Sequence, residues 1–301
     1  MKPAAISRAA ALSCVVAASV LWSLSGAFKS VLLAPTPLHL NDPVIVPMHI
    51  AFWRALAAGL VLVPTLRRSD LSFRPAMLGM VACFAVMNVM FVEALSRGTA
   101  ANAIFLQYTA PLWLYIGSVF LLGERPSRQS TLAVLCGTLG VAIIVAAGWQ
   151  SEQLLVVALA LGSGIAYAGV LMFLRYLREA SPAWLVVQNH LGAALVLTPL
   201  VATLSVPSAG QLAWLSLFGA VQMALPYWLM ARGLQRVSAQ EAGTLTLLEP
   251  LLNPVWAFLV VPGIETPTAA TLVGGAFILA GIAVRYWPTA QMRSSSTSSI
   301  E

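Results

Sequence analysis

The chain has 301 residues, of which 59% are hydrophobic and only 9% are charged, and its formal net charge is +6. An ordinary soluble domain carries about 25% charged residues, so this composition and a mean hydropathy of +0.88 exclude a soluble protein and indicate a multi-pass membrane protein. A hydrocarbon core about 30 Å thick needs about 20 apolar residues per helix, which leaves room for about ten spans and for no separate soluble domain.

Apolar runs between turn and charge punctuation predict ten membrane-spanning helices. They lie near residues 9–34, 44–66, 73–96, 99–121, 128–148, 153–177, 182–205, 210–234, 239–262 and 267–287. The first run follows Lys2 and Arg8 and continues to Leu33 without a small-residue cleavage pattern. This favours a retained span over a signal peptide.

Basic residues gather in connections that share one side of the membrane. If the N-terminus is inside, all but three of the 16 Lys and Arg residues lie in inner connections and tails. The exceptions are Arg97, which lies outside, and Lys29 and Arg54, which lie within spans. The positive-inside rule therefore predicts cytoplasmic termini in a bacterial plasma membrane. Because no single basic patch forms, a nucleic-acid partner is not indicated.

Several chemistries have no sequence support. Cys14, Cys83 and Cys136 fall in apolar stretches without CxxC spacing or a neighbouring His, which predicts neither a disulfide nor a metal site. The chain has no Walker A, GxSxG or HExxH sequence, so we expect no enzyme, no ATP-driven pump and no cofactor. The Ser- and Thr-rich residues 289–301 predict a disordered cytoplasmic tail.

Two halves of the chain repeat one another. The sequence pattern of residues 94–125 recurs at residues 233–265, mostly at a shift of 139 positions (250 − 111). The shared pairs are Leu95 and Leu234, Arg97 and Arg236, Ala100 and Ala239, Ala103 and Ala242, Pro111 and Pro250. The repeats cover residues 1–149 and 150–288, and each holds five spans. Because five is odd, the second copy enters the membrane from the opposite side, which is a design of transporters.

Short motifs resemble a known family. They are L-W-S-L-S-G-A-F-K-S around Trp22, A-L-S-R-G-T-A-A-N-A from Ala94, Q-Y-T-A-P from Gln107, G-E-R-P from Gly123 and L-E-P-L from Leu248. They resemble the EamA family of the drug/metabolite transporter superfamily. The resemblance implies ten transmembrane helices and export of amino acids or other metabolites from the bacterial cytoplasm. The pair Gln107-Tyr108 is similar to the aromatic amino acid exporter branch, whereas Ala110 departs from that branch.

Polar residues within spans are the candidates for a binding site, because an ionisable group in a membrane normally faces the interior or a water-filled cavity. On the ninth span Thr246, Glu249, Asn253 and Trp256 recur at helical spacing and predict one inward face. Glu249 precedes Pro250, whose missing N–H frees a carbonyl one turn back. The alternative is that these side chains only join helices.

The other candidates come from the remaining spans. An amide and a phenol, Gln107 and Tyr108, suit an ammonium and a carboxylate. For Arg54 the sequence leaves two roles open, which are binding of a substrate carboxylate and a structural or snorkelling role. The predicted substrate-binding set is Trp22, Asn88, Gln107, Tyr108, Tyr167, Tyr227, Glu249 and Asn253.

These features predict a secondary transporter that exports small metabolites, amino acids first among them, by alternating access around a cavity between the repeats. Its partners are the small-molecule substrate and the lipid bilayer, and either a monomer or a homodimer is compatible with the sequence. Export of sugars, nucleotide precursors or cationic drugs is the alternative within transport. A channel-like or sensory membrane protein is the alternative from another class.

Overall fold

The apolar runs fold as helices. The computed structural model describes residues 7–122, 128–148, 153–177, 179–234, 236–237, 242 and 245–286. Every regular element within these ranges is a helix, and no strand occurs in them. Six helical segments there are long and apolar enough to cross a membrane, and three shorter apolar helices accompany them. The predicted all-helical, multi-pass class is therefore confirmed, whereas the arrangement of ten helices in two inverted repeats stays a prediction.

The described helices lie at the predicted spans. Before residue 123 they are α1 (Arg8–Trp22), α2 (Ser25–Leu33), α3 (Pro47–Leu62), α4 (Ala76–Arg97), α5 (Ala100–Gln107) and α6 (Ala110–Leu122). The 3-10 turns η1 (Val63–Thr65) and η2 (Arg68–Asp70) follow α3. After residue 127 come α7 (Arg128–Gly148), α8 (Gln153–Tyr176), α9 (Pro182–Val201), α10 (Ala209–Phe218), the π-helix η3 (Gly219–Ala224), α11 (Leu225–Gly233), α13 (Leu248–Val260) and α14 (Ala269–Tyr286).

Three predictions fall outside the described residues. They are the boundary between the halves at residues 149 and 150, the G-E-R-P segment at 123–126 and the tail from residue 289. Each stays a prediction.

Two predicted spans of the first half are interrupted near their middle, where polar groups compete with the helical ladder. Between α1 and α2 the Ser23 hydroxyl donates to the carbonyl oxygen three residues earlier, at 2.6 Å. Between α5 and α6 the Thr109 hydroxyl makes the same kind of bond, also at 2.6 Å. Such bonds bend or end helices, and Pro111 has no N–H with which to continue the ladder. Trp22 and Tyr108 therefore lie beside irregular backbone.

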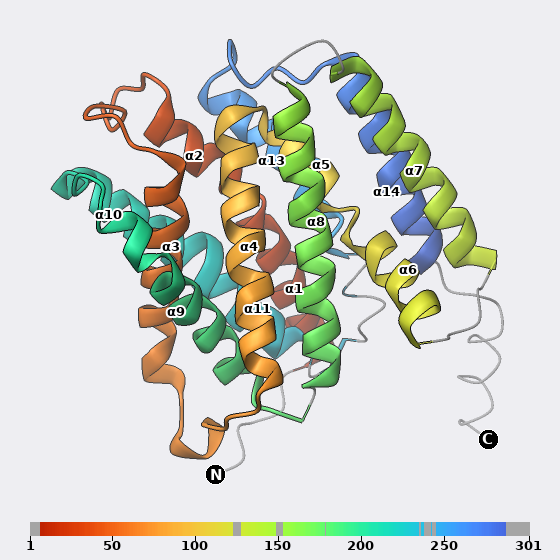
Figure 1. The fold of residues 1–301 in the computed structure, drawn as a ribbon, viewed down its shortest axis with the longest axis horizontal. Coiled ribbons are helices and arrows are strands. Elements are labelled where there is room, and N and C mark those ends of the chain that lie inside the picture. The colour runs from red at the N-terminus through yellow and green to blue at the C-terminus, as the bar shows by residue number, and fades with distance from the viewer. Residues whose placement is uncertain are drawn as a thin grey trace.

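Helices from the two halves of the chain pack against each other. α3 contacts α9, α4 contacts α8, and α7 runs beside α14 at one side of the bundle (Figure 1). α1 packs on α11, and α2 packs on α13. The starts of α5 and α8 lie at the same end of the bundle as α2, the upper end in Figure 1. This end is called the α2 end below.

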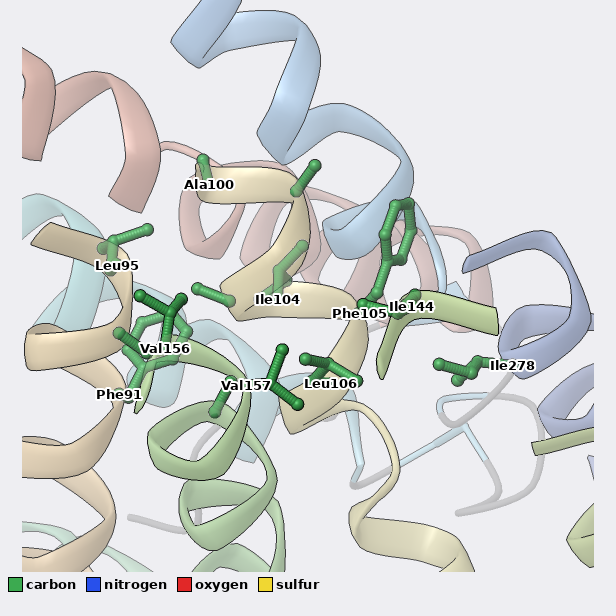
Figure 2. Close-up of a cluster of buried hydrophobic side chains, with 14 of the residues drawn as sticks. Phe91, Leu95, Ala100, Ile104, Phe105, Leu106, Ile144, Val156, Val157 and Ile278 are labelled. Atoms are coloured by element: carbon green, nitrogen blue, oxygen red, sulfur yellow. The ribbon is translucent and has the colours of Figure 1, made fainter. Parts of the chain in front are cut away.

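Apolar side chains fill the interior and also cover the outside. Ala100, Ile104 and Leu106 of α5 are fully buried against side chains of α4, α7, α8 and α14 (Figure 2). On the outside, large hydrophobic side chains such as Phe120 and Leu195 are 81% and 74% exposed. Large exposed apolar surfaces mark contact with a membrane or a partner, and here they agree with a bundle surrounded by lipid.

Candidate functional site

A cavity of about 230 Å³ lies between the two halves of the chain. Its aromatic lining is Trp22, Phe91, Tyr108, Tyr167 and Tyr227. Its polar and charged lining is Arg54, Gln222, Thr246 and Glu249. A concave, largely apolar pocket with a few polar groups is the usual form of a small-molecule site.

The carboxylate of Glu249 stands at the start of α13, at the wall of this cavity. The Tyr108 hydroxyl lies 2.7 Å from Oε2 of Glu249 and 3.0 Å from the carbonyl oxygen of Thr246. A phenol has one proton, so it can donate to only one of these oxygens at a time. The break between α5 and α6 therefore brings a residue of the first half onto the carboxylate of the second.

Trp22 and Tyr227 form an aromatic corner of the cavity. Their rings meet edge to face with centroids 5.2 Å apart, an arrangement that the ring quadrupoles favour. Nε2 of Gln222 donates to the carbonyl oxygen of Trp22 at 3.1 Å, a group that the break after α1 leaves free. Gln222 lies in the π-helix, a wide turn that is frequent at functional sites.

Arg54 and Asn88 are joined by hydrogen bonds, and of the two only Arg54 lines the cavity. Oδ1 of Asn88 accepts from Nη2 of Arg54 at 2.6 Å and from Nε at 3.3 Å. Nδ2 of Asn88 donates to the carbonyl oxygen of Ala51 at 2.8 Å. Asn88, predicted as a binding residue, is fully buried and holds Arg54 in place.

The eight predicted binding residues thus divide into two groups. Those that line the cavity are Trp22, Tyr108, Tyr167, Tyr227 and Glu249, and their role in binding stays a prediction. Those that do not line it are Asn88, Gln107 and Asn253. Gln107 is buried at the end of α5.

Asn253 joins helices near the α2 end instead of lining the cavity. Its Nδ2 donates to the Ser25 hydroxyl at 2.6 Å, and Nε1 of Trp256 donates to the Ser23 hydroxyl at 2.9 Å. The polar face predicted on this span therefore makes two kinds of contact, one with the cavity and one with neighbouring helices. Its first turn reaches the cavity, and the later turns contact the break between α1 and α2.

An ion pair that the sequence did not predict lies at the α2 end. Lys29 of α2 pairs with Glu265, which lies in the connection between α13 and α14, and both side chains are buried. Oε2 of Glu265 also accepts the backbone N–H of Ala100 at 2.8 Å, which caps the start of α5. A lone lysine within an apolar span needs a counter-charge, and this rule is the signal that points to a hidden carboxylate partner.

Glycine lets the helices approach closely beside this ion pair. A Cβ atom at Gly26 would lie 2.7 Å from Cβ of Ala100, 2.7 Å from Oδ1 of Asn253 and 3.0 Å from Cβ of Ala257. Lys29 and Glu265 themselves line a wide depression of about 900 Å³ at the α2 end, together with Arg97. Gly26, Ser25 and Asn253 line neither the depression nor the central cavity.

Comparisons with known proteins identify the family. The sequence profile of the EamA-like transporter family matches residues 9–146 and, a second time, residues 154–287. The chain belongs to the EamA-like transporter family. An uncharacterized transporter of Archaeoglobus fulgidus is 27% identical over 240 residues, which cover 79% of this chain and 86% of that protein. A riboflavin transporter of Vibrio cholerae is 28% identical over 199 residues, 64% of each protein.

A solved structure supports the fold alone. It matches with a TM-score of 0.62 at 18% sequence identity and covers 93% of this chain and 98% of the other. Membership of the EamA-like transporter family confirms the resemblance found in the motifs. The family and the names of the relatives indicate a membrane transporter of small molecules and not an enzyme.

Proposed function

We propose that the chain is a secondary transporter that exports small metabolites, with amino acids as the first candidates, across the bacterial plasma membrane. The observation that carries the proposal is the cavity of about 230 Å³, because both halves of the chain line it and the Glu249 carboxylate stands at its wall. Transporters built from repeats bind their substrate between the repeats near mid-membrane. A carboxylate accepts hydrogen bonds from an ammonium group, and aromatic rings supply apolar walls.

Ten helices in two inverted repeats, residues 1–149 and 150–288, are the architecture proposed for this transporter. The double match of the family profile supports it. The packing of α3 on α9 and of α7 on α14 joins helices at equal positions in the two halves, and the pair α4–α8 has its counterpart in α11–α1. A two-fold axis in the membrane plane would produce this pattern. The distribution of basic residues supports an outer position of the α2 end and a cytoplasmic position of both termini.

Alternating access requires the cavity to open to one side at a time. At the α2 end the Lys29–Glu265 ion pair, the hydrogen bond from Asn253 to Ser25 and the close approach at Gly26 join the two halves. These contacts support assigning this conformation to a state closed on the outer side. Export then requires them to separate.

Riboflavin is the second candidate substrate. One relative is named a riboflavin transporter, and the aromatic lining around Trp22, Tyr167 and Tyr227 suits a flat ring system. Riboflavin carries neither an ammonium group nor a carboxylate, so its recognition would not depend on Glu249 as a counter-charge.

Efflux from proteoliposomes tests both candidates. Vesicles with purified protein are loaded with labelled amino acids or with riboflavin, and the protein-dependent efflux of each is measured. We expect efflux of at least one amino acid, which Glu249→Gln lowers about tenfold or more, because a hydrogen bond to a charged group contributes about 1.5–3 kcal/mol. Glu179→Gln is the matched control, because that carboxylate is 71% exposed and lies outside the cavity; it should leave efflux unchanged.

Two other results would replace the proposal. Efflux of riboflavin without efflux of any amino acid would move the assignment to flavins.

A cysteine placed at Gln222 would distinguish a channel from a transporter. In a channel, impermeant thiol reagents reach it from both sides at once, whereas alternating access exposes it to one side at a time.

A further inference from the structure

Arg54 is a buried cation at the wall of the cavity. Its side chain is 2% exposed, and the oxygen of Asn88 fixes two of its nitrogens. The rings of Phe91 and Phe218 lie 5.9 Å and 5.3 Å from the guanidinium carbon. These contacts hold the guanidinium in one orientation, and none of them supplies a negative charge.

The Arg54 guanidinium therefore lacks a counter-charge among the described residues. Ion pairs in the described part of the chain involve Lys29, Arg74 and Arg97, but not Arg54. Its Nη1 is shielded from solvent and has no hydrogen-bond partner among the described residues. A buried charge without a counter-charge is costly, and within a membrane it commonly marks a functional site. A negative group brought into the cavity would supply the missing partner.

We infer that Arg54 binds a carboxylate of the solute that occupies the cavity, an inference that rests on the proposed transport function. The planar fork of a guanidinium donates parallel hydrogen bonds to the two oxygens of a carboxylate. Elsewhere on the cavity lining stand two acceptors, the carboxylate of Glu249 and Oε1 of Gln222, which is buried without a partner. A small zwitterion with one carboxylate and one ammonium group, such as a free amino acid, matches this set of groups.

Arg54 also joins α3 to α4 through Asn88, so a purely structural role is the rival explanation. The two roles differ in what they predict for ligands. A structural Arg54 stabilises the protein to the same extent whatever ligand is present, whereas a binding Arg54 makes affinity depend on the charge of the ligand.

Binding to the purified full chain, followed by quenching of tryptophan fluorescence, measures that dependence. The probes are acids and their size-matched amides: L-leucine with L-leucinamide, L-phenylalanine with L-phenylalaninamide, and phenylacetate with phenylacetamide. We expect at least one acid to bind about tenfold or more tightly than its amide, because the amide lacks the charge-assisted hydrogen bonds. Arg54→Gln should abolish this preference. Arg54→Lys keeps the charge and should retain part of it, which covers the case in which Arg54→Gln does not fold.

Arg97→Gln is the matched control, because this arginine lies in the depression at the α2 end and not in the cavity. It should leave the preference for acids unchanged. Equal binding of acid and amide by the natural protein, or no binding of either, overturns the inference, as does a preference that survives Arg54→Gln.

The efflux and binding experiments can fail independently of each other. Amino acid efflux without a preference for acids retains the transport proposal and removes the role of Arg54. Arg54-dependent binding of phenylacetate without efflux of any amino acid retains the role of Arg54 and removes the proposal of amino acid transport.

Discussion

Lys29 and Arg54 are both buried cations in membrane spans of the first half, yet their surroundings differ. Lys29 meets the carboxylate of Glu265, which also caps the start of α5. Arg54 meets the neutral amide of Asn88 and two aromatic rings, and it lines the central cavity. The charge of Lys29 is neutralised inside the protein, whereas Arg54 lines the cavity without a counter-charge among the described residues.

This difference supports separate roles for the two cations. A buried pair that is already satisfied gains nothing from a solute, but it holds two parts of the chain together until it breaks. A charge fixed by neutral groups retains its attraction for an anion. The comparison therefore supports the roles proposed for the two cations, Lys29 in closing the α2 end and Arg54 in recognising the solute. Three substitutions test it.

Breaking the Lys29–Glu265 pair should have the largest effect. Glu265→Gln leaves Lys29 buried without a counter-charge, which costs about 3–5 kcal/mol in comparable cases. We expect a lower unfolding temperature in detergent. We also expect faster labelling, by impermeant thiol reagents applied from outside, of a cysteine placed at Gln222. Unchanged stability and unchanged labelling would show that the pair does not close the α2 end.

Filling the space at Gly26 should have an intermediate effect. In Gly26→Ala the new Cβ meets short side chains of Ala100, Asn253 and Ala257, which cannot move aside without a shift of the backbone. Overpacking of this kind costs about 1–3 kcal/mol. Because the contact belongs to the closed α2 end, the same labelling experiment should show greater exposure from outside.

Gly263→Ala is the control for this substitution, because a Cβ there would have nothing within 4 Å. It should leave labelling unchanged. If the two variants label at the same rate, the close approach at Gly26 does not keep the α2 end closed.

Simple membrane chemistry predicts much of the site from the sequence. Ionisable groups within apolar spans face the interior, which predicts Glu249, and aromatic residues at comparable depth on several helices predict a pocket wall. Trp22, Tyr108, Tyr167, Tyr227 and Glu249 all line the cavity. The family and the helical class follow from local motifs and hydropathy in the same way. Such rules state that a residue faces the interior, but not which part of the interior it reaches.

The remaining differences between the predicted and the observed positions lie in depth and in distant partners. Asn253 shares a helix face with Glu249, but four residues raise it by about 6 Å along the axis, where α2 packs closely and leaves no cavity. The pairing of Lys29 with Glu265 spans 236 positions of the chain, and no local pattern encodes it. The sequence does not decide between the two roles of Arg54, because only the packed structure shows that its hydrogen-bond partner is a neutral amide and that no described ion pair includes it.

Arg97 provides the smallest test, because it is a cation of the α2 end that solvent reaches. It pairs with Glu93 one turn away on α4 at 2.6 Å, and its side chain is 53% exposed. Exposed pairs at this helical spacing contribute about 0.3–0.5 kcal/mol, and salt screens them. Glu93→Gln should therefore change the unfolding temperature only slightly, and less at 1 M salt than at low salt. If Glu93→Gln instead destabilised the protein as much as Glu265→Gln, burial would not be what distinguishes the two pairs. The assignment of closure to Lys29 would then fail.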